Sequence, residues 1–341
     1  CENAHSLKEL PSLGIDTVIT SPPYVNGTNY FRNTKIELWF LRCLTEKEDL
    51  TRFRSVALTA GINDVTVAKT PVCSHPEVKK IVSILEQNAY DSRIPRMIAS
   101  YFSEITDIFQ AICTHLIPNA TVAVDIGDSC YGGVHVPVDQ LLSACLSDIG
   151  LVQEDSVTLR QRKSRGGTLL KQSLLVFKYH PKQTRFSIKE STLPWRMEWD
   201  NFKKNLPHQQ TPFIKRNWGH AWHSLCSYPG KLKPAIAHFM VKTFVPTGGR
   251  VLDPFAGVGT LPFEAALQGK LAYGFELSSA AFVIANAKIQ RSTDQDCVEV
   301  IGTLKDFIES NSPTAQELDE VVQLGFNGKI VEYYEIQTLN E

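Results

Sequence analysis

The chain has 341 residues, 43% of them hydrophobic and 21% charged, and a formal net charge of −1, which is ordinary for a globular protein of one large or two modest domains. No apolar run reaches the roughly 18 residues of a membrane span, and the N-terminus lacks a signal-peptide pattern, so we expect a cytoplasmic protein with no membrane partner. The eight cysteines form no CxxC pair and have no regular spacing, as is typical of reduced thiols, so we expect no disulfide framework. Because the chain begins with Cys1 rather than Met, we expect a trimmed N-terminus.

The first predicted element is a strand that ends at two prolines. Residues 16–20 (DTVIT) are short and β-branched, as in a buried parallel strand, and the letters SPPY follow directly. Neither Pro22 nor Pro23 offers an amide donor, and Ser21 before them is restricted to extended geometry. We therefore expect a stiff loop with carbonyls at fixed positions, ending in the ring of Tyr24. Alone, this pattern also fits a plain strand-terminating turn.

The rest of the first 180 residues predicts alternating helices and strands. Residues 34–44 and the apolar period of residues 94–112 indicate helices, the second ending at Pro118-Asn119, whereas residues 45–76 show no clear element. Residues 121–126 indicate a second buried strand. Further on we expect a helix at 138–149 and two strands at 151–160 and 173–179, joined by the basic loop QRKSRGG.

Basic residues concentrate between Arg160 and Lys233, where 16 Lys and Arg stand against three acids. Such an imbalance is typical of a polyanion-binding surface. Four of the five tryptophans lie in the same span, and flat rings among cations favour a nucleic acid, although a solvated basic face with core tryptophans is the alternative. Residues 181–222 show neither period and predict an irregular recognition segment. The candidate phosphate contacts are Arg160, Arg162, Lys163, Arg165, Lys203, Lys204, Lys215 and Arg216.

A second lobe contains the most informative letters of the chain, DPFAGVGTLPFEAALQGKLAYGFELS. After a helix at 233–244, they predict a strand at 250–253, a glycine loop, a helix at 261–268 and a strand at 271–275. Gly257 and Gly259 would let the backbone approach a ligand, and Glu276 at the strand end can accept hydrogen bonds from ribose hydroxyls. A third glycine and a GK[ST] sequence are both missing, so a nucleoside cofactor smaller than a dinucleotide is favoured.

Together, ITSPPY and LDPFAGVGT resemble the catalytic and cofactor motifs of AdoMet-dependent DNA amino-methyltransferases, which methylate cytosine N4 or adenine N6. The catalytic motif comes first, as in the permuted beta group, and YPGKLKP resembles the segment beside the methionine end of the cofactor. The resemblance implies an α/β, Rossmann-like methyltransferase fold with a mostly parallel central sheet, circularly permuted motif order and an irregular basic target-recognition insert. It divides one domain into a catalytic half (1–180), a target-recognition segment (181–222) and an AdoMet-binding half (223–341).

The same resemblance implies a role for each motif residue. The Ser21 hydroxyl and the Pro22 carbonyl accept hydrogen bonds from the target amino group, which aims its lone pair at the sulfonium methyl, while Tyr24 stacks on a flipped base. No covalent intermediate is needed, so no cysteine is assigned a role. The implied catalytic residues are Ser21, Pro22, Pro23 and Tyr24. The implied S-adenosyl-L-methionine (AdoMet) site comprises Asp253, Pro254, Phe255, Ala256, Gly257, Gly259, Thr260, Glu276, Tyr228 and Lys231.

TSPPY favours cytosine N4 as the target, because cytosine N3 is more basic than adenine N1 and a short hydroxyl beside it can donate or accept. Adenine N6, an RNA or protein amide substrate, and a nucleic-acid-binding pseudoenzyme are the alternatives. His220, His223 and Cys226 have a spacing that could serve a metal, but no fourth ligand stands nearby and we expect no metal site. The expected partner is double-stranded DNA at a prokaryotic nucleoid, with a cognate restriction endonuclease as a second candidate.

Overall fold

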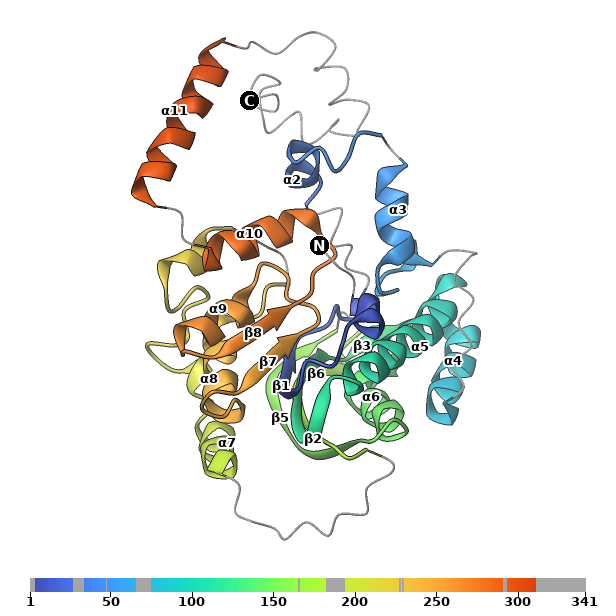
Figure 1. Ribbon diagram of the computed structural model, residues 1–341. Helices are drawn as coiled ribbons and strands as arrows, with labels where there is room; N and C mark the ends of the chain where they lie inside the picture. Colours follow the sequence, from blue (N-terminus) through green and yellow to red (C-terminus); the bar gives the residue numbers. More distant parts are fainter. Residues whose placement is uncertain are drawn as a thin grey trace.

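The computed structural model describes residues 4–26, 34–46, 48–65, 75–164, 166–181, 194–226, 228, 230–290 and 293–310. In this part of the chain a six-stranded sheet lies at the centre, between two layers of helices (Figure 1). The strand order is β5-β6-β2-β1-β7-β8. The strands are β1 (Ile15–Thr20), β2 (Leu116–Gly127), β5 (Leu151–Lys163), β6 (Leu169–Tyr179), β7 (Arg250–Asp253) and β8 (Leu271–Gly274).

The sheet is mostly parallel. Strands β2, β1, β7 and β8 pair in parallel, whereas β6 runs antiparallel to both of its neighbours, β2 and β5. Strands β1 and β7 are neighbours, with Val18 opposite Leu252, although they come from the two ends of the chain. The mostly parallel α/β fold expected from the sequence is therefore confirmed. A small antiparallel ribbon, β3 (Ser129–Tyr131) and β4 (Val134–Val136), stands apart from this sheet.

Both faces of the central strands are apolar. Successive strand residues point to opposite faces, so neighbouring residues of one strand belong to different cores. Val18 and Val122 face a core that includes residues of helices α4, α5 and α6. Ile19 and Ala123 face a second core, formed with helices α7, α8 and α9. These helices are α4 (Pro76–Asn88), α5 (Arg93–Cys113), α6 (Val138–Ser147), α7 (Pro194–Asn205), α8 (Pro234–Phe244) and α9 (Thr260–Leu267).

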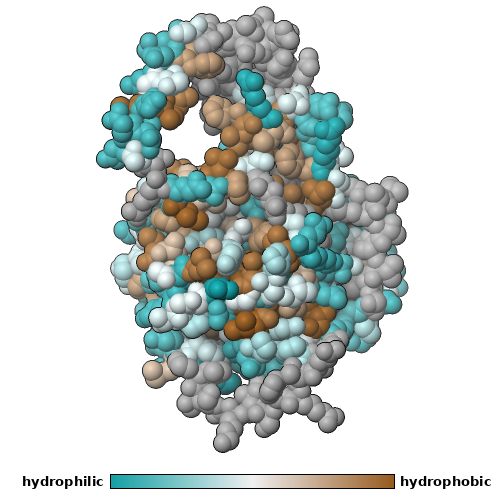
Figure 2. Space-filling view, in the orientation of Figure 1, coloured by the Kyte–Doolittle hydropathy of each residue, from teal (hydrophilic) through white to brown (hydrophobic). Residues whose placement is uncertain are grey.

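Further helical segments complete the part of the chain that the structure describes. Helix α11 projects from the body at the upper left of Figure 1, and Figure 2 shows apolar side chains on it among hydrophilic ones. Within the described residues, no helix is both long enough and apolar enough to cross a bilayer. These elements are η1 (Ala4–Glu9), α2 (Lys35–Phe40), α3 (Asp49–Val56), η2 (Ile62–Asp64), η3 (Pro207–Gln209), η4 (Ala221–Ser224), α10 (Ser279–Ile289) and α11 (Asp294–Ser310).

Several element boundaries differ from the sequence-based expectation. Helix α5 ends at Cys113, and Pro118 and Asn119 instead lie inside strand β2. They fall in an irregular stretch between two pairings with β1, where Asn119 adopts a left-handed φ of 64°. Helix α2 ends at Phe40, four residues earlier than expected, and Arg42 just after it also has a positive φ of 54°. Helices α3 and α4 were not expected at all.

The most important difference concerns the segment expected to be irregular. Residues 194–205 form helix α7, so the expectation is wrong there. Trp195, Trp199 and Phe202 recur at helical spacing, and the Trp199 side chain is 1% exposed, with its ring stacked on Phe202. Trp199 is therefore a core residue and is not available to stack on a base. Residues 182–193 of the same segment lie outside the described residues.

Candidate active site

The two motifs lie side by side because their strands are adjacent and parallel. SPPY follows β1 and PFAG follows β7, so both loops leave the sheet at the same edge. In open α/β sheets, ligands bind at this edge, outside the carboxyl ends of the strands. The Thr20 hydroxyl donates a hydrogen bond of 2.8 Å to Asp253 Oδ1 and ties the two strand ends together.

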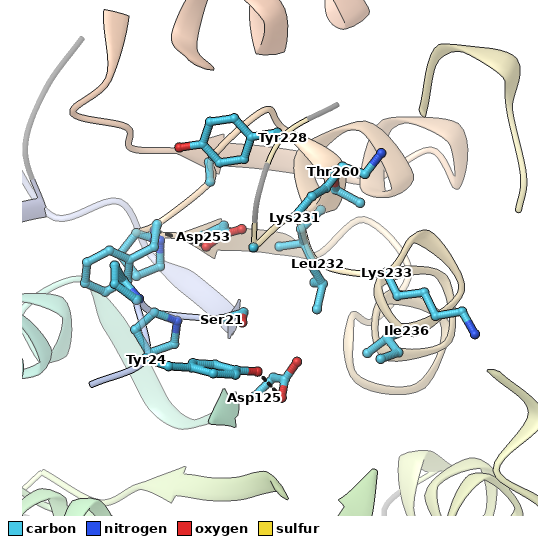
Figure 3. Close-up of a pocket in the computed structure, with 18 of the residues that line it drawn as sticks. Ser21, Tyr24, Asp125, Tyr228, Lys231, Leu232, Lys233, Ile236, Asp253 and Thr260 are labelled. Atoms are coloured by element: carbon cyan, nitrogen blue, oxygen red, sulfur yellow. Dashed lines mark hydrogen bonds between the residues drawn. The ribbon is translucent and has the colours of Figure 1, made fainter. Parts of the chain in front are cut away.

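A cavity of ≈ 1150 Å³ opens at this edge (Figure 3). Ligand pockets usually occupy roughly 300–1,000 Å³, so this one has room for a cofactor and part of a second ligand. Every expected catalytic residue lines it, as does every expected cofactor residue except Gly259. These lining residues are Ser21, Pro22, Pro23, Tyr24, Tyr228, Lys231, Asp253, Pro254, Phe255, Ala256, Gly257, Thr260 and Glu276.

Asp125, near the end of β2, is a cavity residue that sequence reasoning missed. The Tyr24 hydroxyl donates a hydrogen bond of 3.0 Å to its Oδ1, as Figure 3 shows, and the Gln172 amide donates to both oxygens, at 2.9 and 3.0 Å. Burial raises the pKa of Asp125 to about 6, although the bonds from Gln172 and Tyr24 favour the ionised form. A carboxyl group that titrates near neutral pH therefore holds the Tyr24 ring.

The Tyr24 ring lies against the backbone of strand β2 on one side. A Cβ added to Gly127 would come within 3.0 Å of ring atoms Cδ2 and Cε2 of Tyr24. Only a residue without a side chain leaves the ring its present place. The ring is thus fixed by Gly127 at one face and by Asp125 at its hydroxyl.

Two more buried carboxyl groups belong to the cofactor motif. Asp253 Oδ1 accepts from the Phe255 amide at 3.1 Å, in addition to the bond from Thr20. Glu276 accepts from the amides of Gly257, at 2.8 Å, and Ser278, at 2.7 Å. Burial raises the pKa of Asp253 to about 7 and also raises the pKa of Glu276. With Asp125, these groups make the cavity suitable for a cation and for hydroxyl donors.

The two glycines of the GVG loop differ in what surrounds them. Both have a left-handed φ, 52° at Gly257 and 72° at Gly259. A Cβ on Gly257 would meet Tyr228 Cε1 at an ordinary 3.6 Å, whereas a Cβ on Gly259 would lie 2.8 Å from Ala285 Cβ in α10. Gly259 is outside the cavity lining and permits close packing of α10, which differs from the expectation that it approaches the ligand.

The candidate phosphate contacts do not form one uniform set. Arg160 lines the cavity, and Arg162 and Lys163 continue along exposed positions of β5. Lys203 is paired with Asp155 and, at 3.1 Å, with Asp200, so its charge is largely neutralised within the protein. Exposed positions are also occupied by Lys204, Lys215 and Arg216. Arg165 lies outside the described residues.

The HAWHSLC segment makes contacts of its own. His223 Nε2 lies 2.7 Å from Glu264 Oε1, and His220 Nδ1 accepts from the Trp222 amide at 3.2 Å. Trp222 stacks on Phe263 with ring centroids 6.1 Å apart. In the part of the chain that the structure describes, no group of three or more His, Cys, Asp or Glu residues could hold a metal ion.

The sheet is mostly parallel, and two adjacent strands lead into a proline loop and a glycine loop that line one cavity. This arrangement defines a Rossmann-like methyltransferase fold. The family model of the N6 and N4 enzymes, described as DNA methylase, matches residues 15–287. The chain therefore belongs to this DNA methylase family.

The curated relatives share a little over a quarter of the aligned residues with this chain. The chain is 28% identical over 185 residues to the type II methyltransferase M.BsoBI of Geobacillus stearothermophilus, a match that covers 46% of this chain and 36% of that protein. It is 28% identical over 176 residues to M.AvaI of Nostoc sp., with the same coverage. The match thus spans about a third of the length of these relatives. Among solved structures, the cytosine-N4-specific PvuII DNA methyltransferase aligns at 10% identity and a TM-score of 0.46, covering 88% of this chain and 89% of that one.

Proposed function

We propose that the protein is a DNA methyltransferase that transfers the methyl group of AdoMet to an exocyclic amino group of a base flipped out of duplex DNA. The observation that carries this proposal is the single cavity shared by SPPY and DPFAG, with the strand ends joined by the bond from Thr20 to Asp253. The SPPY loop would hold the target base and the DPFAG loop would hold AdoMet. The methyl donor and the accepting amino group would therefore meet within one cavity.

The cofactor end of the cavity has groups that suit AdoMet. Thr260 Oγ1 is buried and has no hydrogen-bond partner among the described residues, which fits a polar ligand atom that would satisfy it. The amides of Gly257 and Ser278 orient the Glu276 carboxylate, whose remaining lone pairs can accept from ribose hydroxyls. Asp253 adds a negative charge that complements a sulfonium cation. When bound, AdoMet supplies an electrophilic methyl group.

At the base end, the chain's own residues hold and orient the target. The SPP backbone is rigid, so the Ser21 hydroxyl and the Pro22 carbonyl offer acceptors at fixed positions for the two N–H bonds of an amino group. The Tyr24 ring, held by Gly127 and Asp125, offers a flat surface for the base. Asp125 can accept a proton as the amino group loses one, because its pKa lies near neutrality.

Within this proposal the target atom is cytosine N4, and adenine N6 is the alternative. The short Ser21 hydroxyl suits the more basic ring nitrogen of cytosine. Adenine presents a similar pattern of amino group and ring nitrogen, so the Asp125 carboxyl group fits either base. The choice therefore depends on Ser21 and is settled by product analysis.

The DNA path is proposed to run from the cavity along the outer part of β5. Arg160 stands at the cavity and Arg162 follows on the same side of the strand, since side chains two residues apart share a face. Lys204, Lys215 and Arg216 would add phosphate contacts from the other side. Lys203 is left out of this path because its partners are Asp155 and Asp200.

We also propose the division of the domain at residues 180 and 222, a cytoplasmic location with the DNA, and a cognate endonuclease as a partner. The experiment that tests the activity is transfer of a radiolabelled methyl group from AdoMet to duplex DNA, to transfer RNA and to protein in parallel. Label in duplex DNA alone supports the proposal. Label confined to RNA or protein would support the corresponding alternative substrate, and binding of DNA and AdoMet without any transfer would indicate a pseudoenzyme.

A further inference from the structure

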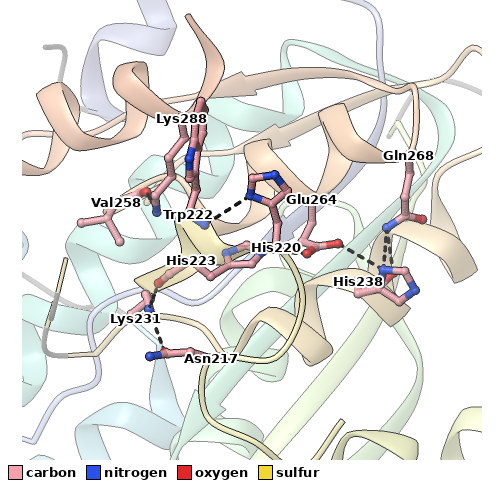
Figure 4. Close-up of polar contacts among 10 residues, drawn as sticks. All are labelled: Asn217, His220, Trp222, His223, Lys231, His238, Val258, Glu264, Gln268 and Lys288. Atoms are coloured by element: carbon pink, nitrogen blue, oxygen red, sulfur yellow. Dashed lines mark hydrogen bonds and ion pairs between the residues drawn. The ribbon is translucent and has the colours of Figure 1, made fainter. Parts of the chain in front are cut away.

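Outside the cavity, one buried carboxylate joins three elements of the fold. Glu264 on α9 is 2% exposed, and its Oε1 lies 2.7 Å from Nε2 of His223, while its Oε2 lies 3.1 Å from Nδ1 of His238 (Figure 4). His223 belongs to η4 and is 0% exposed, and His238 belongs to α8. Burial alone would raise the pKa of Glu264, but the bonds from His223 and His238 outweigh it and lower that pKa, so the carboxylate is ionised.

His223 in turn holds a lysine of the cofactor cavity. Its backbone carbonyl accepts a hydrogen bond of 2.5 Å from Nζ of Lys231, which also donates to Asn217 Oδ1 at 3.2 Å (Figure 4). Lys231 lines the cavity beside the GVG loop. Burial and the nearby positive charge of Arg216 lower the pKa of Lys231. A continuous set of contacts therefore runs from Glu264 through His223 to Lys231.

We propose that Glu264 and His223 are positioning residues that hold Lys231 for the carboxylate of the amino-acid end of AdoMet. This inference rests on the proposed function. Neither residue lines the cavity. Glu264 acts by fixing the His223 ring to α9, and the fixed His223 carbonyl keeps the flexible Lys231 side chain in place before the cofactor binds. The nucleoside end of AdoMet, near Glu276, is independent of this contact.

The test uses calorimetry with AdoMet and with 5′-methylthioadenosine, which has the nucleoside and the sulfur but lacks the amino-acid end. Glu264→Gln keeps the size of the side chain and removes the charge that pairs with His223. We expect AdoMet to bind about tenfold more weakly to this variant, whereas methylthioadenosine binds as it does to the unaltered protein. Lys231→Met should show the same selective loss. In the double variant the two losses should not add, because both act on one contact.

Two controls separate positioning from general damage. His238→Gln alters the other partner of Glu264, which has no bond to Lys231, so it should leave AdoMet affinity nearly unchanged. If Glu264→Gln does not fold, His223→Asn tests the same link at its next residue. Unchanged AdoMet affinity, equal weakening for both ligands, or additive losses would each overturn the inference. Unaltered protein that binds methylthioadenosine and AdoMet equally would also overturn it, whereas unaltered protein that binds neither would contradict the proposed function and the inference together.

Discussion

The hydroxyl of Thr20 donates a hydrogen bond of 2.8 Å to Oδ1 of Asp253, a residue 233 positions further along the chain. The bond joins the last residue of β1 to the last residue of β7, so it fixes the base loop relative to the cofactor loop. Burial raises the pKa of Asp253 to about 7, although the bond from Thr20 favours the ionised form.

Asp253 should make the stability of the protein depend on pH. Its pKa is about 7 in the folded protein against roughly 3.9 for an unperturbed aspartate, so the folded state binds the proton more tightly than the unfolded state. The free energy of unfolding should therefore fall as the pH rises from 4 to 7, by an amount on the order of 4 kcal/mol for about three pKa units. Asp253→Asn removes the ionisable group and therefore this loss of stability at high pH. The variant should be more stable than the unaltered protein at pH 8 and show no such advantage at pH 4, as measured by urea unfolding.

If Asp253→Asn differs from the unaltered protein by the same free energy of unfolding at pH 4 and at pH 8, the raised pKa of Asp253 is contradicted. Thr20→Val provides a control, because it removes a hydrogen bond that favours the ionised carboxylate. That variant should lose more stability at pH 8 than at pH 4.

The pH dependence of cofactor affinity should distinguish AdoMet from S-adenosylhomocysteine. The buried carboxyl groups Asp125 and Asp253, with pKa values of about 6 and about 7, ionise as the pH rises through this range, and their negative charge attracts a sulfonium cation. S-adenosylhomocysteine has the same amino-acid end but no positive sulfur. The affinity for AdoMet divided by the affinity for S-adenosylhomocysteine should therefore rise by about tenfold between pH 5.5 and 8, which equals about 1.4 kcal/mol. Titration calorimetry measures both ligands, and a ratio that does not change with pH would contradict this role.

Tyr24 should affect turnover much more than cofactor binding. Tyr24→Ala removes the stacking surface, so the turnover number should fall by about tenfold or more while the KM for AdoMet changes little. Tyr24→Phe keeps the ring and loses the bond to Asp125, with an expected effect of about fivefold, as for a single hydrogen bond. Gly127→Ala should resemble Tyr24→Ala, because the new methyl group would displace the ring. Steady-state kinetics with varied AdoMet and DNA compare the three variants, and equal losses for Ala and Phe would show that the hydroxyl matters rather than the ring.

Phosphate contacts should appear in the salt dependence of DNA binding. Replacing Arg160 and Arg162 together by Ala should flatten the log–log slope by up to roughly 1.8, since each lost contact removes about 0.9. Lys203→Met is the matched control, because Lys203 is already paired with Asp155 and should change the slope little. Fluorescence anisotropy from low to moderate salt measures both slopes. If the control flattens the slope as much as the double variant does, the proposed DNA path is misplaced.

The gathering of the expected cofactor residues around one cavity follows from local signals in the sequence. The β-branched run before SPPY and the glycines, prolines and acid around β7 and β8 each restrict the nearby backbone directly. Nine of the ten expected cofactor residues line the cavity for that reason. Gly259 was assigned to the ligand because a glycine pattern does not distinguish approach by a ligand from approach by a helix.

The positions of Asp125 and Trp199 became clear only in the three-dimensional structure, for opposite reasons. Asp125 reaches the site only because β2 pairs with β1 so that Val124 lies opposite Thr20, a long-range register that no local pattern specifies. Trp199 did have a readable helical spacing with Trp195 and Phe202, but the surrounding basic residues favoured a nucleic-acid interpretation. Charge along a sequence does not show which side chains of a helix face the core.

The central claim is that this cavity methylates an exocyclic amino group in DNA, and mass spectrometry of nucleosides tests it most directly. Unmethylated DNA of mixed sequence is incubated with the protein and AdoMet, digested, and compared with a reaction that contains the Tyr24→Ala variant. The account predicts N4-methyldeoxycytidine with the unaltered protein and much less with the variant. N6-methyldeoxyadenosine alone would contradict the argument from Ser21 but leave amino methylation standing. The absence of both nucleosides, from protein that binds AdoMet and DNA, would contradict the central claim.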